Sequence, residues 1–123
     1  MIIMKKILII EDDIVLNNAY KQKLEPLFTL ISAVDGETGF TKAIGEQPDL
    51  IILDLILPGL ENGLQILTKL KNNPDTKHIP VIVITNIDNQ SGPAIEMGAV
   101  DYLIKSNIDM NQVVEKINTY LPK

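Results

Sequence analysis

The sequence predicts an α/β fold in which a parallel sheet is covered by helices on both faces. Short apolar runs alternate with segments whose apolar residues recur at helical spacing, which is typical of parallel strands joined by crossover helices. The stretch LIILDLILPG at residues 50–59 is apolar around a single carboxylate and ends in turn residues, as expected of a strand buried on both faces. A length of 123 residues fits one domain over residues 1–123.

The first half of the chain supplies two strands and two helices. Strands are predicted at residues 6–10 and 29–33. The helix between them follows from one apolar face, made by Leu16, Tyr20, Leu24 and Leu27, and Pro26 should end it. A second helix is predicted at residues 37–44, stopped by Gly45, with three side chains directed inward: Phe40, Ala43 and Ile44.

The second half continues the alternation. Strands are predicted from Leu50, at residues 81–84 and at residues 100–104, and helices at residues 64–71, 93–97 and 110–121. Asn107 or Asp109 should cap the last helix. Five strands of this kind fit the flavodoxin-like (βα)5 arrangement, a doubly wound sheet in the order 2-1-3-4-5.

Polar side chains follow four of these strands at the point where each strand ends. Glu11, Asp12 and Asp13 follow the first strand, Asp54 lies in the third, Thr85 ends the fourth and Lys105 ends the fifth. In the order 2-1-3-4-5 these four strands are adjacent, and ligands of such sheets bind at the carboxyl ends of the strands. The groups are therefore expected to converge on one cleft.

The chemistry of that cleft follows from its residue types. Several carboxylates repel one another unless a cation neutralises them, and oxygen ligands without His or Cys favour Mg²⁺ or Mn²⁺. A lysine ammonium and a hydroxyl suit a phosphoryl group, and a carboxylate such as that of Asp54 can accept a phosphoryl group covalently.

Composition narrows the choice of partners. The chain has no cysteine and no arginine, and its formal net charge is −5. Disulfides and zinc–thiolate sites are thereby excluded, direct nucleic-acid binding is not expected, and a cationic or protein partner is favoured. No apolar stretch reaches membrane-spanning length and no signal peptide is evident, so no membrane contact and a cytoplasmic location are expected.

These residues resemble a known family. The resemblance is to the response-regulator (CheY-like) receiver domain of two-component, phosphorelay signal transduction, and it spans almost the whole chain. It rests on four pieces in order: ILIIEDD at residues 7–13, Asp54 followed by Leu57-Pro58-Gly59, Thr85, and GAVDYLIK at residues 98–105.

The resemblance implies a phosphoacceptor site. Asp54 would become an aspartyl phosphate, with Mg²⁺ (or Mn²⁺) held by Asp12, by Asp54 and by the backbone carbonyl of Ile56, and with Glu11 acting through water. The phosphoryl donor would be a phosphohistidine on a sensor histidine kinase or a phosphotransfer protein.

The resemblance also implies a readout. Lys105 would contact the phosphoryl group, Thr85 would hydrogen-bond one of its oxygens, and Tyr102 would be the aromatic rotamer switch. The fourth helix, fifth strand and fifth helix would signal to an unidentified downstream protein, and the chain is expected to act as a stand-alone phosphoprotein rather than as an enzyme.

Three departures from the family pattern carry expectations. Ser106 follows Lys105 where the family commonly has proline after a cis peptide, and we expect the cis bond to be retained here. The loop after Asp54 is one residue longer, which predicts a local bulge. The segment between Thr85 and Lys105 is short and contains Ser91-Gly92-Pro93, which predicts a short or distorted fourth helix.

Other interpretations stay open. Asp13 is expected to be a helix cap rather than a ligand, and His78 is expected to lie on the surface. Thr85, Lys105 and Tyr102 could each be ordinary strand or surface residues. The chain could also be a pseudo-receiver, an interaction domain without phosphorylation. An Mg²⁺-dependent phosphohydrolase with an Asp nucleophile is a further alternative, although its nucleophile usually lies on the first strand.

Overall fold

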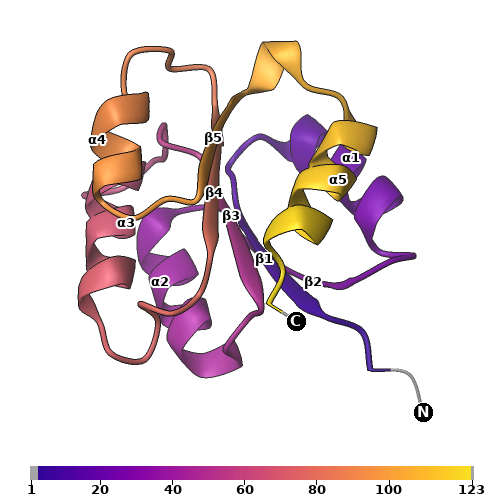
Figure 1. The fold of residues 1–123 in the computed structure, drawn as a ribbon, viewed down its shortest axis with the longest axis horizontal. Coiled ribbons are helices and arrows are strands. Elements are labelled where there is room, and N and C mark those ends of the chain that lie inside the picture. The colour runs from indigo at the N-terminus through magenta and orange to yellow at the C-terminus, as the bar shows by residue number, and fades with distance from the viewer. Residues whose placement is uncertain (1–2, 123) are drawn as a thin grey trace.

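A five-stranded parallel sheet forms the centre of the molecule (Figure 1). The computed structural model describes residues 3–122. Its strand order is β2-β1-β3-β4-β5, which confirms the predicted flavodoxin-like order. The strands are β1 (Lys6–Ile10), β2 (Thr29–Ala33), β3 (Leu50–Leu53), β4 (Val81–Thr85) and β5 (Asp101–Ile104).

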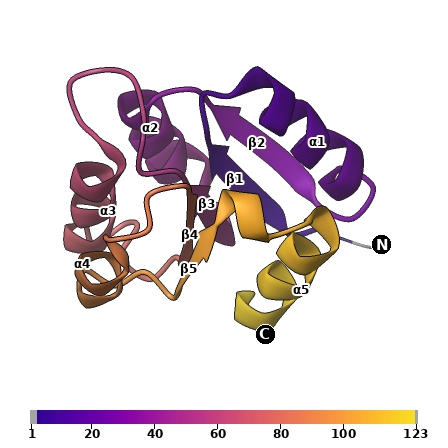
Figure 2. The same cartoon turned by 90° about the horizontal axis from the view of Figure 1, so that it is seen from above.

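Helices cover both faces of the sheet. They are α1 (Ile14–Leu24), α2 (Gly36–Glu46), α3 (Gly63–Asn72), α4 (Ser91–Glu96) and α5 (Met110–Tyr120), with a 3₁₀ turn, η1 (Lys105–Asn107), after β5. Figures 1 and 2 show α2, α3 and α4 on one side of the sheet and α1 and α5 on the other. No helix within residues 3–122 has the length and hydropathy needed to cross a membrane.

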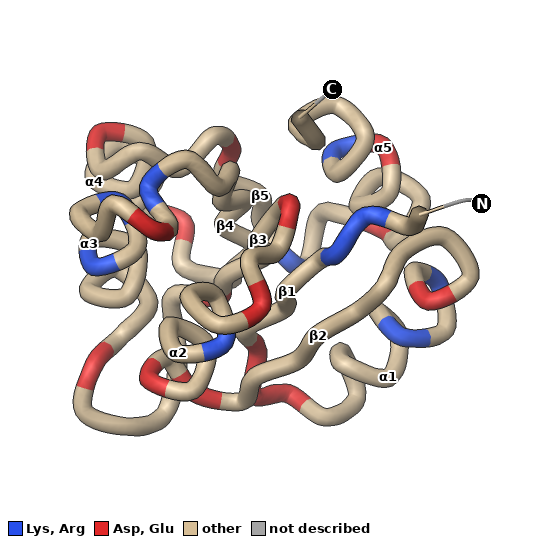
Figure 3. Tube along the Cα trace, turned by 90° about the horizontal axis from the view of Figure 1, so that it is seen from below, with Lys and Arg blue, Asp and Glu red and all other residues tan. Residues whose placement is uncertain are grey.

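Each face of the sheet carries its own apolar core. Leu8, Leu53 and Val83 point toward the layer of α2, α3 and α4. Ile9 and Ile52 point toward the layer of α1 and α5. Strands β3 and β4 contain no charged residue, and the charged residues lie mainly on helices and loops (Figure 3). This double-sided burial explains why the strand sequences are continuous apolar runs rather than alternating ones.

Side-chain caps define where four of the helices begin. Asp13, Asp35, Asn62 and Asp109 each accept a hydrogen bond from a backbone N–H of the first turn. Such caps satisfy amide groups that have no partner inside the helix. Asp13 is therefore a helix cap, as the sequence predicts, and Asp109 rather than Asn107 caps α5.

Some predicted details of the helices are wrong. Leu27 lies beyond the end of α1 and is 49% exposed, because the helix ends at Leu24, before Pro26. Gly45 does not stop α2, which runs from Gly36 to Glu46 and ends with Gln47 in the left-handed region (φ +48°). Ile44 is exposed rather than directed inward. Helix α4 is short, as predicted, but it begins at Ser91 instead of Pro93.

Gly63 brings the start of α3 against the backbone that follows β3. A Cβ built on Gly63 would lie 2.3 Å from the carbonyl oxygen of Asp54 and 2.4 Å from the Cα of Leu55. We predict that Gly63→Ala destabilises the protein by about 1–3 kcal/mol, because backbone cannot yield as a flexible side chain can. Chemical denaturation measures this change.

Gly45→Ala is the matched control. Apart from the adjacent residues and the backbone of its own helix, nothing lies within 4 Å of a Cβ built at Gly45. Because this glycine is inside α2, alanine should raise the free energy of unfolding by about 0.5–1 kcal/mol. Equal effects of the two substitutions would contradict the close approach at Gly63.

Candidate functional site at the carboxyl ends of the strands

Strand pairing places the candidate site residues side by side. Ile10 of β1 pairs with Leu53 of β3, so the residues that follow them, Glu11 and Asp54, are neighbours. The Asp54 N–H donates to the carbonyl oxygen of Ile10 at 3.1 Å, which continues the ladder by one residue. The two carboxylates are thereby held at one edge of the sheet, as the strand order predicts.

Lys105 joins these two carboxylates. Its Nζ lies 2.6 Å from Asp54 Oδ2 and 2.7 Å from Glu11 Oε1. The side chains of Glu11 and Asp54 are only 2% and 4% exposed, whereas that of Lys105 is 18% exposed. Two buried carboxylates next to each other need a cation, and the ammonium of Lys105 supplies that charge.

The surroundings shift the pKa values of this cluster. Burial raises the pKa of the Glu11 carboxyl, and the charge of Asp54 adds to the rise, while hydrogen bonds from Lys105 and from the Asp13 N–H oppose it. Burial alone would lower the pKa of Lys105, but the hydrogen bonds and charges of Asp54 and Glu11 raise it above its ordinary value. Lys105 is therefore a cation at neutral pH.

The donor set fits a hard divalent cation. Glu11, Asp12 and Asp54 each offer a carboxylate oxygen, and these atoms lie within 4.8 Å of one another. Asp12 is exposed, so it can reach a cation that approaches from solvent. An all-oxygen set of carboxylates is typical of Mg²⁺ or Mn²⁺ sites. The N–H of Ile56 donates to Asp54 Oδ1 at 3.2 Å, which fixes the backbone next to this cluster.

Thr85 and Tyr102 meet through the backbone of one loop residue. Thr85 is fully buried, and its Oγ1 accepts a hydrogen bond from the Ile87 N–H at 3.4 Å. The hydroxyl of Tyr102, which is half-buried, donates to the carbonyl oxygen of the same Ile87. The two residues that the family resemblance assigns to a switch are thus connected through Ile87.

The expected cis bond between Lys105 and Ser106 is wrong. Residues 3–122 contain no cis peptide bond. A cis bond before a residue other than proline costs roughly 3–4 kcal/mol. The 3₁₀ turn η1 starts at Lys105 instead, and the Ser106 N–H donates to Asn86 Oδ1 at 3.1 Å. Lys105 reaches Asp54 with this trans backbone, so the strained bond is unnecessary.

Two asparagines support the site through hydrogen bonds that the sequence pattern does not predict. Asn17, which is buried on α1, donates through Nδ2 to the carbonyl oxygen of Glu11 at 2.7 Å. Asn86 holds the turn after Lys105 by accepting a hydrogen bond from the Ser106 N–H. A polar residue on the inward face of α1 is the one signal that could have identified Asn17. The bond made by Asn86 depends on the conformation of η1, which the sequence pattern does not reveal.

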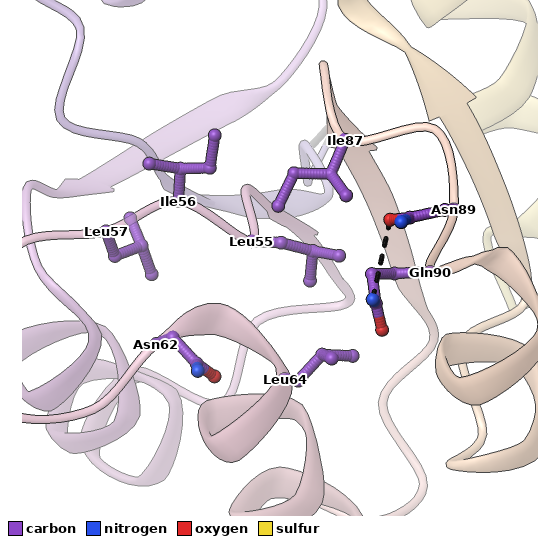
Figure 4. Close-up of a pocket in the computed structure, with 8 residues that line it drawn as sticks. All are labelled: Leu55, Ile56, Leu57, Asn62, Leu64, Ile87, Asn89 and Gln90. Carbon is purple, nitrogen blue, oxygen red and sulfur yellow. Dashed lines mark hydrogen bonds between the residues drawn. The ribbon is translucent and has the colours of Figure 1, made fainter.

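A cavity of about 520 Å³ lies between the loops that follow β3 and β4 (Figure 4). Its lining comprises Leu55, Ile56, Leu57, Asn62, Leu64, Ile87, Asn89 and Gln90. None of these side chains is charged, so this cavity is chemically distinct from the neighbouring carboxylate cluster.

The single histidine of the chain takes no part in the cluster or the cavity. His78 is exposed, as predicted.

Comparison with known proteins identifies the family. The family model of the response regulator receiver domain matches residues 7–118. The chain belongs to the response regulator receiver family. Among curated relatives, this receiver domain is 39% identical to response regulator PleD of Caulobacter vibrioides over 63% of its length, and 34% identical to protein PilH of Pseudomonas aeruginosa over 75%.

The match covers very different fractions of the two relatives' own lengths. It is 17% of PleD and 76% of PilH, so the receiver domain spans only a small part of the first of these proteins. Among solved structures, the Mn²⁺-bound form of response regulator Rcp1 is similar with a TM-score of 0.80 and 30% identity. That match covers 97% of this chain and 99% of the Rcp1 chain.

Removal of the Lys105 charge tests its place in the cluster. We predict that Lys105→Met lowers the free energy of unfolding by about 2 kcal/mol without divalent cations, because two buried carboxylates lose their shared cation. This loss of unfolding free energy is smaller than for a fully buried ion pair, because the Lys105 side chain is partly exposed. Mg²⁺ should recover part of the loss, as followed by thermal unfolding with and without Mg²⁺.

Lys116→Met is the matched control. Lys116 also pairs with a carboxylate, Asp101, at 3.2 Å, but its side chain is 42% exposed. Its loss should change stability little and should not alter the response to Mg²⁺. Equal losses in the two variants would contradict a special role of Lys105.

Proposed function

We propose that this receiver domain is a phosphoacceptor in which Asp54 takes a phosphoryl group from a phosphohistidine. The observation that carries the proposal is the contact of the Lys105 ammonium with Asp54 (2.6 Å) and Glu11 (2.7 Å), in reach of the exposed Asp12. One buried carboxylate, one lysine and a cluster of hard oxygen ligands are what a transferring phosphoryl group requires.

In the transfer step, an oxygen of the Asp54 carboxylate attacks phosphorus. The P–N bond of the phosphohistidine breaks, and its electron pair stays on the imidazole nitrogen of the donor. No general base on this chain is needed, because the carboxylate is already the nucleophile. The hydrogen bond from the Ile56 N–H to Oδ1 orients that carboxylate.

Three groups would stabilise the transferred phosphoryl group. Lys105 would donate to one of its oxygens, and the hydroxyl of Thr85 would donate to another. Asp12, Asp54 and the Ile56 carbonyl would hold Mg²⁺, with Glu11 acting through water. Bound there, the ion would offset the negative charge that collects on the phosphoryl oxygens. The Mn²⁺-bound form of the related Rcp1 supports a divalent cation at this kind of site.

The readout would run from Thr85 to β5. A shift of Thr85 toward the phosphoryl group would pull on the Ile87 N–H and release or tighten the bond of Tyr102 to the Ile87 carbonyl. Tyr102 lies on β5, so the surface formed by α4, β5 and α5 would change with it.

The proposed partners are proteins of a cytoplasmic phosphorelay. The donor would be a sensor histidine kinase or a phosphotransfer protein, and the receptor of the signal would be a downstream protein that reads the α4–β5–α5 surface. The domain would not turn over an external substrate, because the phosphoryl group remains on its own side chain until hydrolysis.

Intact mass measurement tests the acceptor. Incubation with a small phosphodonor and Mg²⁺ should add the mass of one phosphoryl group, and Asp54→Asn should add none. Omission of Mg²⁺ should strongly reduce the modification. An unmodified native protein, or modification that persists in Asp54→Asn, would refute the proposal.

Substitution of Tyr102 tests the readout separately. Tyr102→Phe removes the hydroxyl that bonds to Ile87, so Asp54 should be phosphorylated as before while the amide shifts of β5 respond less to phosphorylation. NMR spectra of the two forms measure this response. Tyr120→Phe is the control, since that hydroxyl bonds to Asp101 rather than to the loop. A full response in Tyr102→Phe would exclude this route.

A further inference from the structure

The middle of the loop between β3 and α3, residues 57–61, is held to the rest of the protein by few contacts. Its ends are fixed, since Ile56 bonds to Asp54 and the Gly63 N–H donates to the Leu55 carbonyl at 3.0 Å. Within residues 3–122, the backbone of residues 57–61 makes a single hydrogen bond to a different element. The Glu61 N–H donates it to Glu37 Oε1, in the first turn of α2, at 3.2 Å.

The same carboxylate also lies beside the middle of this loop. Gly59 has φ of +103°, and a Cβ built on it would lie 2.9 Å from Glu37 Oε2. A side chain at residue 59 would therefore be strained and would displace Glu37. One oxygen of Glu37 holds the end of the loop, and the other lies against its turn.

Glu61 ties the loop to α3 as well. Its carboxylate pairs with Lys69 Nζ at 3.0 Å, and the same Nζ lies 4.6 Å from the centre of the Phe40 ring on α2. These contacts are partly exposed, so each is weak alone. Together they close a ring of contacts from α2 through the loop to α3 and back.

We propose that Glu37 is a positioning residue of the divalent-cation site. Glu37, Gly59, Glu61 and Lys69 form what we name the Glu37 clamp, which holds the loop that carries the Ile56 carbonyl. This inference rests on the proposed function in assigning that carbonyl to the cation. A loop that is ordered before binding loses less conformational freedom when the cation binds, so the clamp raises affinity without touching the ion.

Two substitutions of Glu37 separate positioning from charge. Glu37→Ala removes both the hydrogen-bond acceptor and the charge, whereas Glu37→Gln keeps an oxygen that can accept from the Glu61 N–H. Glu46→Ala is the control, because Glu46 is at the other end of the same helix, where it pairs with Lys6 at 3.6 Å. It removes an equal charge but leaves the loop untouched.

Two measurements on the unphosphorylated protein give the answer. Amide hydrogen exchange without divalent cations reports the bond of the Glu61 N–H, and a Mg²⁺ titration followed by the NMR signals of Ile56 and Leu57 gives the dissociation constant. In Glu37→Ala the Glu61 amide should exchange faster and the dissociation constant should rise by about threefold to tenfold. Glu37→Gln should stay near the native protein, and Glu46→Ala should match it.

Three results would overturn the inference. An unchanged dissociation constant in Glu37→Ala with a faster Glu61 amide would show that the loop needs no clamp. An equal weakening in Glu37→Gln would show that charge alone acts. An unprotected Glu61 amide in the native protein would show that the clamp does not exist. Phosphorylation of Asp54 is scored separately by mass, so failure of the proposed function leaves these readouts intact.

Discussion

The ammonium of Lys105 between Glu11 and Asp54 is the interaction on which the edge of the sheet depends. Two carboxylates that are almost fully buried, at the ends of adjacent strands, would repel each other without a cation. The requirement links β1, β3 and β5, because each supplies one member of the cluster at its carboxyl end. The strand order β2-β1-β3-β4-β5 is therefore a condition of the charge balance as well as of the apolar packing.

The same interaction bears on which ions the cluster can bind together. A divalent cation on Asp12 and Asp54 would take over the charge that Lys105 now offers to Asp54, and the ammonium could then turn toward an anion. In the proposed function a phosphoryl group would bring such an anion, so the cation and the lysine would be complementary rather than redundant. Asn17 and the Asp13 N–H hold Glu11 in place on the other side, so the exchange need not disturb β1.

The sequence predicts the parts that depend on burial and misses those that depend on local backbone conformation. Apolar runs that are buried on both faces identify the strands, and the polar residue that interrupts or ends each run lies at the edge of the sheet. Helical spacing does not reveal where a helix ends or how far the core extends. For that reason it wrongly predicts that Leu27 and Ile44 face the core. The bond after Lys105 is trans although the family pattern predicts cis, because a cis bond to serine costs roughly 3–4 kcal/mol and Lys105 reaches Asp54 without it. The roles of Thr85 and Tyr102 rest on resemblance, and the sequence gives no sign of the Ile87 backbone that connects them.

The trans bond and the short α4 have a common consequence for the readout side. Ser106 bonds to Asn86, and Tyr102 bonds to Ile87, so the loop after β4 is fastened to β5 and to η1 by two hydrogen bonds. Helix α4 spans only Ser91–Glu96, and its N-terminal residue has no side-chain cap. A displacement of Thr85 would therefore act first on a loop that is tied to β5, and only then on a short helix without a side-chain cap. To pass a signal, phosphorylation would have to shift the balance between two conformations of the loop after β4. The helix would follow that loop.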